Sequence, residues 1–119
     1  MNVLVSAKGY QLRSNLRALV VERIEESLQR FEDRIREVRV YLGDENGPKK
    51  GIDRTIQVVV DMDHLPLVIV KERGSDWENT LHRATDRVVE SIGRSVDRQR
   101  SHSRTMSMAG NDSIPQLDA

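Results

Sequence analysis

The spacing of the apolar residues changes along the chain, and this constrains the fold more than any other feature of the sequence. In residues 14–31 they recur at steps of three and four, the period of an amphipathic helix: Leu16, Leu19, Val20, Ile24, Leu28 and Phe31. In residues 35–42 and 55–62 they alternate with residues that are polar except for Val59, the period of a half-buried strand. Residues 66–73 predict a further strand, apolar on both sides.

The two remaining elements complete the predicted order βαβββα. Residues 2–6, NVLVS, form a β-branched run ahead of Gly9, which predicts an opening strand. Ser75 and Glu78 have the spacing of a capping box, in which the serine accepts from an amide three residues on and the glutamate reaches back. A second helix is therefore expected to begin there.

This order predicts an α+β fold, a two-layer sandwich in one domain. Strands with one polar face need helices on the other face only, so a four-stranded, mostly antiparallel sheet should carry both helices on one side. The first two strands, joined through a helix, should be parallel neighbours with a right-handed crossover. We expect the domain to cover residues 1–100 and residues 101–119 to form a disordered tail, because they are polar, contain Gly and Pro and lack periodicity.

The composition argues against several classes of function. Cysteine is absent, which excludes disulfides and thiolate metal sites and suits a reducing compartment. No apolar run approaches the roughly 18 residues of a membrane span, so we expect a cytoplasmic protein with no membrane partner. The 19 basic and 19 acidic residues cancel, so attraction to an anionic partner requires local segregation of charge.

Catalytic and metal sites have little support in the sequence. Asp61, Asp63 and His64 cluster at a strand end, where charged hairpin residues are the ordinary case. The segment GDENG lacks the alternating acids and closing glutamate of a calcium loop, so a turn is expected. We therefore expect a non-enzymatic protein that needs no metal, cofactor or small-molecule substrate.

One flank of the second predicted helix collects arginines. At about 100° per residue, four of them fall within about 60° beside the apolar face, and we call them the arginine row: Arg83, Arg87, Arg94 and Arg98. A planar guanidinium can grip two phosphate oxygens, and about 22 Å of helix fits several successive phosphates. In a second interpretation the arginines only form ion pairs with neighbouring acids on a solvated surface: Asp86, Glu90 and Asp97.

Gly93 lies inside this helix, where glycine costs about 1 kcal/mol relative to alanine. Close packing or early fraying of the helix would account for it, and so would a close approach to a nucleic-acid backbone. The sequence leaves these explanations open.

The order of elements and several segments carry a family resemblance over residues 1 to about 100. These segments are NLRALVVERIEESLQRF, VRVYL, the helix entry GSDW, and ATDRVVESIGRSVDRQR. Together they resemble the ribosome hibernation promoting factor family, also called ribosome-associated inhibitors or ribosomal subunit interface proteins. Residues 101–119 are too few for the C-terminal domain of the long members, so the chain resembles the short form.

The resemblance implies a fold similar to double-stranded RNA-binding domains and a role in stress or stationary phase. Family members bind the small ribosomal subunit between head and body and block the mRNA and tRNA positions. Basic residues on their second helix contact ribosomal RNA (rRNA). The rRNA-binding residues implied for this chain are Arg83, Arg87, Arg94, Arg98, Lys49, Lys50 and Arg17.

A second hypothesis is a protein-interaction module that regulates a transcription factor or forms a weak homodimer. Neutral net charge and mixed ion pairs suit such a module, and the free edge of the sheet could accept a partner strand.

Overall fold

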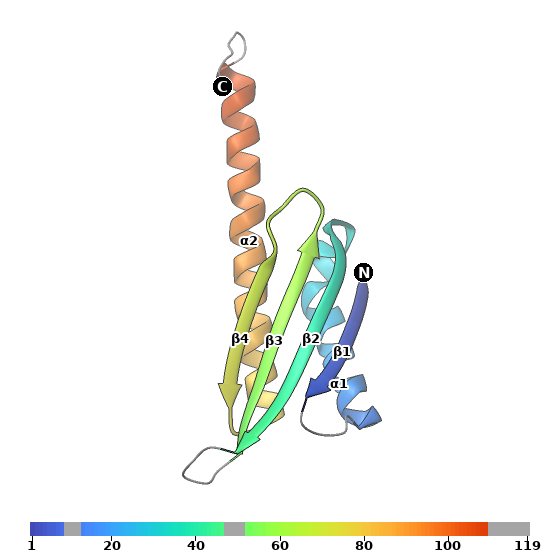
Figure 1. Cartoon of the computed structure of the whole chain (residues 1–119). Helices are drawn as coiled ribbons and strands as arrows, with labels where there is room; N and C mark the ends of the chain where they lie inside the picture. The colour runs from blue at the N-terminus through green and yellow to red at the C-terminus, as the bar shows by residue number, and fades with distance from the viewer. Residues whose placement is uncertain (9–12, 47–51, 110–119) are drawn as a thin grey trace.

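The computed structural model describes residues 1–8, 13–46 and 52–109 (Figure 1). Its elements follow the predicted order βαβββα, with a short 3₁₀ helix, η1, after the first α-helix. They are β1 (Asn2–Lys8), α1 (Ser14–Leu28), η1 (Gln29–Arg34), β2 (Ile35–Asn46), β3 (Ile52–Met62), β4 (Val68–Gly74) and α2 (Trp77–Ala109).

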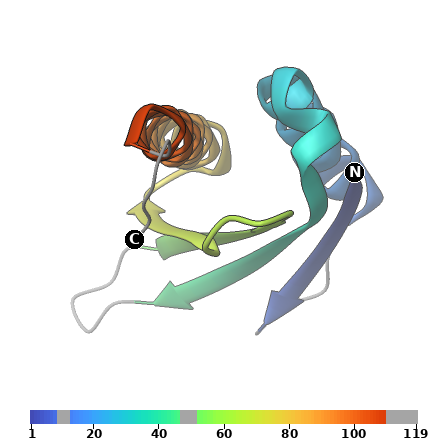
Figure 2. The ribbon, with the colours of Figure 1, turned by 90° about the horizontal axis from the view of Figure 1, so that it is seen from above.

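The four strands form one sheet in the order β1-β2-β3-β4. β1 pairs with β2 in parallel, with Val5 opposite Val40, and the other two pairs are antiparallel, with Val58 opposite Val40 and Val70. Both helices lie on the same face of the sheet, as the view from above shows (Figure 2). The predicted α+β sandwich is therefore confirmed, including its parallel pair.

The core lies between this face and the two helices. Alternate residues of the central strands point into it, and its side chains are almost completely buried: Val38, Val40, Leu42, Ile56, Val58 and Val60 from the sheet, and Val20, Ile24, Leu28, Leu81, Ala84, Val88 and Ile92 from the helices. Burial of one large aliphatic side chain contributes about 1.5 to 3 kcal/mol relative to exposure. Apolar periodicity thus determines which face of each element packs inward.

The predicted capping residue of α2, Ser75, is wrong by one position. The helix begins at Trp77, and the Asp76 carboxylate accepts a hydrogen bond from the backbone N–H of Asn79 at 2.7 Å. Glu78 lies 3.7 Å from the Arg23 guanidinium of α1 and pairs with it instead of closing a capping box with Ser75. Aspartate and serine cap helices about equally well, so the choice between adjacent positions depends on how the chain leaves β4.

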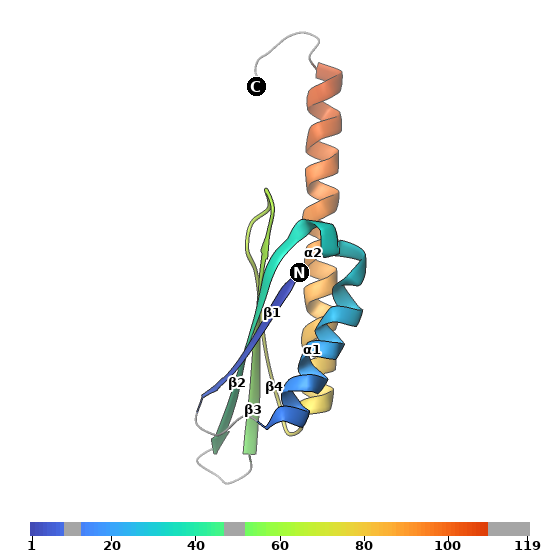
Figure 3. The same cartoon turned by 90° about the vertical axis from the view of Figure 1, so that its right-hand side faces the viewer.

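The second helix is longer than predicted. α2 continues to Ala109 and extends past the end of the sheet (Figures 1 and 3), so residues 101–109 are helical, whereas residues 110–119 of the predicted tail lie outside the described part of the chain. A helix already nucleated by packing gains one hydrogen bond for each residue added and needs no apolar stripe to continue. No helix in the described ranges is long and apolar enough to cross a membrane.

No helix or strand of the described residues covers the face of the sheet opposite the helices. β4 has apolar residues on both of its sides, but only one side is buried. Val68 and Val70 are buried, whereas Ile69 and the preceding Leu67 are more than half exposed. Leu4 and Tyr41 are also exposed, at 47% and 42%. This open face therefore carries apolar side chains in contact with solvent.

Candidate functional site

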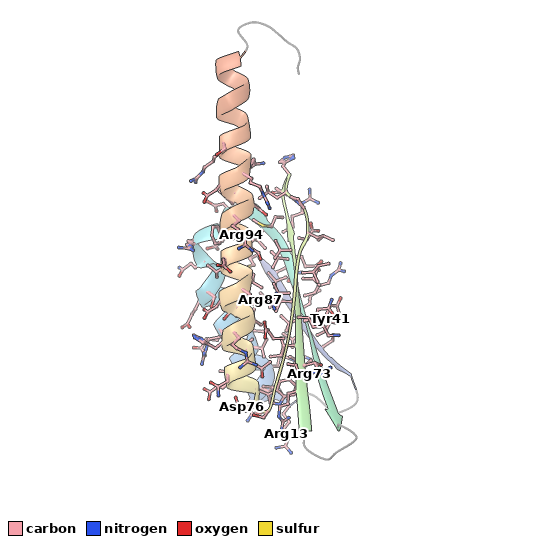
Figure 4. All side chains as sticks on the ribbon, turned by 90° about the vertical axis from the view of Figure 1, so that its left-hand side faces the viewer. Arg13, Tyr41, Arg73, Asp76, Arg87 and Arg94 are labelled. Atoms are coloured by element: carbon pink, nitrogen blue, oxygen red, sulfur yellow. The ribbon has the colours of Figure 1, made fainter. Side chains whose placement is uncertain are left out.

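The arginine row lies along the flank of α2 that overhangs the edge strand β4. All four side chains are exposed, and α2 packs on β4 and β3. Figure 4 views this flank and shows Arg87 and Arg94 on α2 with Arg73 on the neighbouring strand. Helix geometry therefore brings the row together as predicted, and the tertiary fold places it against β4.

The first half of the row is bound to β4. Arg83 donates to the backbone carbonyl of Arg73 at 2.7 Å, and Arg87 donates to that of Lys71 at 3.2 Å. The Glu72 carboxylate lies between them, 2.5 Å from Arg87 and 3.5 Å from Arg83. These contacts occupy two carbonyls of an edge strand, and occupied edge groups disfavour the addition of a partner strand at this edge.

Glu72 is the carboxylate that the sequence analysis missed. It points toward the helical layer at the sheet edge, and its side chain is only 16% exposed. Hydrogen bonding from Arg87 is the main cause that lowers the pKa of Glu72 below its ordinary value of 4.5; burial acts in the opposite direction. The charged form of Glu72 therefore stabilises the fold above pH 4.5, and this contribution is lost as the pH falls through the lowered pKa.

We predict that Glu72→Gln lowers the free energy of unfolding at pH 7 by up to about 1 kcal/mol, since it removes ion pairs whose arginines are half exposed. The difference between wild type and variant should shrink as the pH falls below 4.5, because wild-type Glu72 then becomes neutral as well. Urea denaturation at several pH values measures this difference. A difference that persists undiminished at pH 2 would show that shape, and not charge, is responsible.

The second half of the row is more available to a ligand. Arg94 lies 3.7 Å from Glu90, and both side chains are about two-thirds exposed, so the pair contributes only about 0.3 to 0.5 kcal/mol. Arg98 forms no ion pair or hydrogen bond with the residues that the structure describes. Asp86 lies 3.4 Å from His82 instead of pairing with the row. The interpretation that the row pairs with acids of α2 therefore holds for Arg94 but not for Arg98, and Arg83 and Arg87 pair with Glu72 of β4 instead.

Lys71 and Arg73 add positive charge next to the row. Both are exposed on β4, on either side of Glu72. We call Lys71, Arg73 and the arginine row together the β4 flank. Glu72 and Glu90 neutralise part of the charge of the arginine row, whereas Arg98 forms no ion pair with a described residue. The sequence KER at residues 71–73 could have indicated Lys71 and Arg73. Side chains on either side of a strand residue that points toward the helices lie on the opposite face of the sheet and are exposed there.

The other predicted rRNA-binding residues do not join this flank in the structure. Arg17 lies on α1, which packs beside β1 at the opposite edge of the sheet, and it donates to the backbone carbonyl of Val5 at 3.0 Å. Lys49 and Lys50 lie outside the described residues.

A metal site finds no geometric support in residues 1–8, 13–46 and 52–109, where no three His, Asp or Glu side chains are grouped to hold an ion. Asp63 of the predicted strand-end cluster pairs with Arg36 at 2.5 Å, and this hydrogen bond lowers the pKa of Asp63. A cavity of about 750 Å³ opens between the N-terminal ends of α1 and α2, where the Arg54 guanidinium stacks over the Trp77 ring at 5.0 Å. Cations and carboxylates both line it, which favours no single class of ligand.

The sequence matches the model of the family described as Sigma 54 modulation protein / S30EA ribosomal protein over residues 3–104. No curated protein shows significant similarity to the chain.

Two solved structures have a similar fold. The first is a ribosomal subunit interface protein from Coxiella burnetii, with a TM-score of 0.67 and 13% identity over 79% of this chain and 96% of that one. The second is the N-terminal domain of Protein Y from Thermus thermophilus, with a TM-score of 0.60 and 22% identity over 79% and 98% of the two chains. The family match spans most of the sequence, and the chain therefore belongs to the Sigma 54 modulation protein / S30EA ribosomal protein family.

Proposed function

We propose that this protein is a ribosome-associated translation inhibitor of the cytoplasm. It binds the small ribosomal subunit under stress or in stationary phase and blocks the mRNA and tRNA sites. Family membership and the names of the structural neighbours support association with ribosomes. The observation that carries the proposal is the β4 flank, where arginines along one side of a helix are presented to solvent.

The two halves of the row have different roles in this proposal. Arg94 and Arg98 contact rRNA phosphates directly, because a phosphate replaces the weak Glu90 pair at little cost. Arg83 and Arg87 contribute a weaker field, since Glu72 neutralises part of their charge. Inhibition follows from the bulk of the bound domain in the path of mRNA and tRNA and requires no chemical step.

Cosedimentation with small ribosomal subunits over a range of salt concentrations tests the proposal. If all four arginines release counterions, the logarithm of the binding constant should fall against the logarithm of salt with a slope of about −3, from a coefficient of about 0.7 per contact. A slope near zero, or no cosedimentation at low salt, would contradict rRNA binding.

A second candidate function, a protein-interaction module, is favoured by the open face of the sheet with its exposed Leu4, Tyr41, Leu67 and Ile69. Apolar side chains in one surface region are typical of protein interfaces. Pull-down from a nuclease-treated lysate separates the two functions. A protein partner survives the nuclease, whereas a ribosomal particle does not.

A further inference from the structure

Gly93 has no internal reason to be glycine. A Cβ atom added there meets nothing within 4 Å, so close packing against another element does not require the small residue. α2 continues to Ala109, so the helix does not fray at this point either. Glycine inside a helix nevertheless destabilises it relative to alanine. Two of the three explanations left open by the sequence are thereby removed, and close approach of another molecule remains.

Gly93 faces a groove of about 400 Å³ between α2 and η1. The other lining residues are Arg30, Phe31, Arg34, Val96, Asp97 and Arg100. The lining thus contains three guanidinium groups and a single carboxylate, that of Asp97. None of the three forms an ion pair with a carboxylate of the described residues.

The groove holds two of its arginines in place without neutralising them. The Arg30 guanidinium stacks over the Phe31 ring, 4.8 Å from its centroid. Arg34 donates to the neutral side-chain oxygen of Gln99 at 3.1 Å, which links η1 to α2. Stacking and a neutral acceptor orient a guanidinium while leaving its charge available.

We propose that this groove receives the phosphodiester backbone of an RNA strand, with Gly93 providing the space for close approach. Arg30 and Arg100 then contact phosphates on either side of the glycine. On a helical wheel Gly93 lies about 80° or more from every member of the arginine row, so α2 binds RNA along two of its flanks. This inference rests on the proposed function, because it assigns a second contact surface for the same rRNA.

The test compares substitutions that differ only in what they place in the groove. Gly93→Ala should raise the melting temperature by about 4 °C or more, because alanine favours the helix and meets no neighbour. Gly93→Gln is also a good helix former, but its side chain fills the groove. It should weaken binding to purified small subunits by about tenfold, the loss expected for one charge-assisted contact.

Ala18→Gln is the matched control. It adds the same side chain at an exposed position of α1 outside the groove, and it should leave affinity unchanged. Arg30→Gln with Arg100→Gln should reduce the salt slope by about 1.4. A benzophenone photocrosslinker installed at position 31 should crosslink to RNA in the bound subunit.

Several results would contradict the proposed RNA contact in the groove. Full affinity of Gly93→Gln, while variants of the arginine row bind weakly, would overturn the groove contact and leave the proposed function standing. Crosslinking to a ribosomal protein alone, or a lower melting temperature for Gly93→Ala, would overturn it as well. A wild-type chain that fails to cosediment at any salt concentration would overturn both proposals.

Discussion

Replacing Arg94 and Arg98 together with glutamine should weaken binding to small ribosomal subunits by about a hundredfold at low salt. Each exposed guanidinium is expected to make one charge-assisted contact with a phosphate, and each such contact is worth about a factor of ten. The slope against salt should become less steep by about 1.4, because two fewer counterions are released per bound chain. Cosedimentation across a salt series measures both quantities, and thermal melting checks that the variant folds.

Arg83→Gln with Arg87→Gln is the matched control for this prediction. It makes the same chemical change on the same flank of α2, but these arginines already bind Glu72 and two carbonyls of β4. We expect a smaller loss of affinity and a larger loss of stability than for the Arg94 and Arg98 pair. The opposite ranking would mean that Glu72 releases its partners on binding. An unchanged slope in both variants would remove the β4 flank as the rRNA surface.

The arginine row could be predicted from sequence because helix geometry alone determines it. Residues three, four and seven apart share one side of any helix, whatever the helix packs against. The pairing of the row could not be predicted in the same way. Glu72 precedes Arg83 and Arg87 on a different element and meets them only because β4 is an edge strand under α2. The acids nearest in sequence were therefore the wrong partners to consider for these two arginines.

Element order was also predictable, but the limits of α2 were not. A capping box and a neighbouring aspartate, Asp76, are equally good local signals, and the path of the chain out of β4 decides between them. The end of α2 was missed because apolar periodicity reports packing and not helicity. Past Arg100 the helix has no sheet beside it, so its sequence no longer needs an apolar stripe to remain helical (Figure 3).

The largest effect on stability is expected for Ile24→Ala. Ile24 is fully buried between α1 and the sheet, so its truncation removes the transfer free energy of the lost carbons and leaves a cavity. The free energy of unfolding should fall by about 2 to 5 kcal/mol, a large share of the 5 to 15 kcal/mol typical of a domain. The melting temperature should fall by about 10 °C or more, which thermal denaturation followed by circular dichroism measures.

Leu4→Ala is the control for the loss of unfolding free energy expected for Ile24→Ala. It removes a side chain of similar size from the open face, where Leu4 is 47% exposed, and should cost about 1 kcal/mol or less. The two variants therefore test burial at nearly constant chemistry. A cost for Leu4→Ala that equals that of Ile24→Ala and grows with protein concentration would contradict an uncovered face. It would mean that a second copy of the chain buries the open face in solution, because only association makes stability depend on concentration.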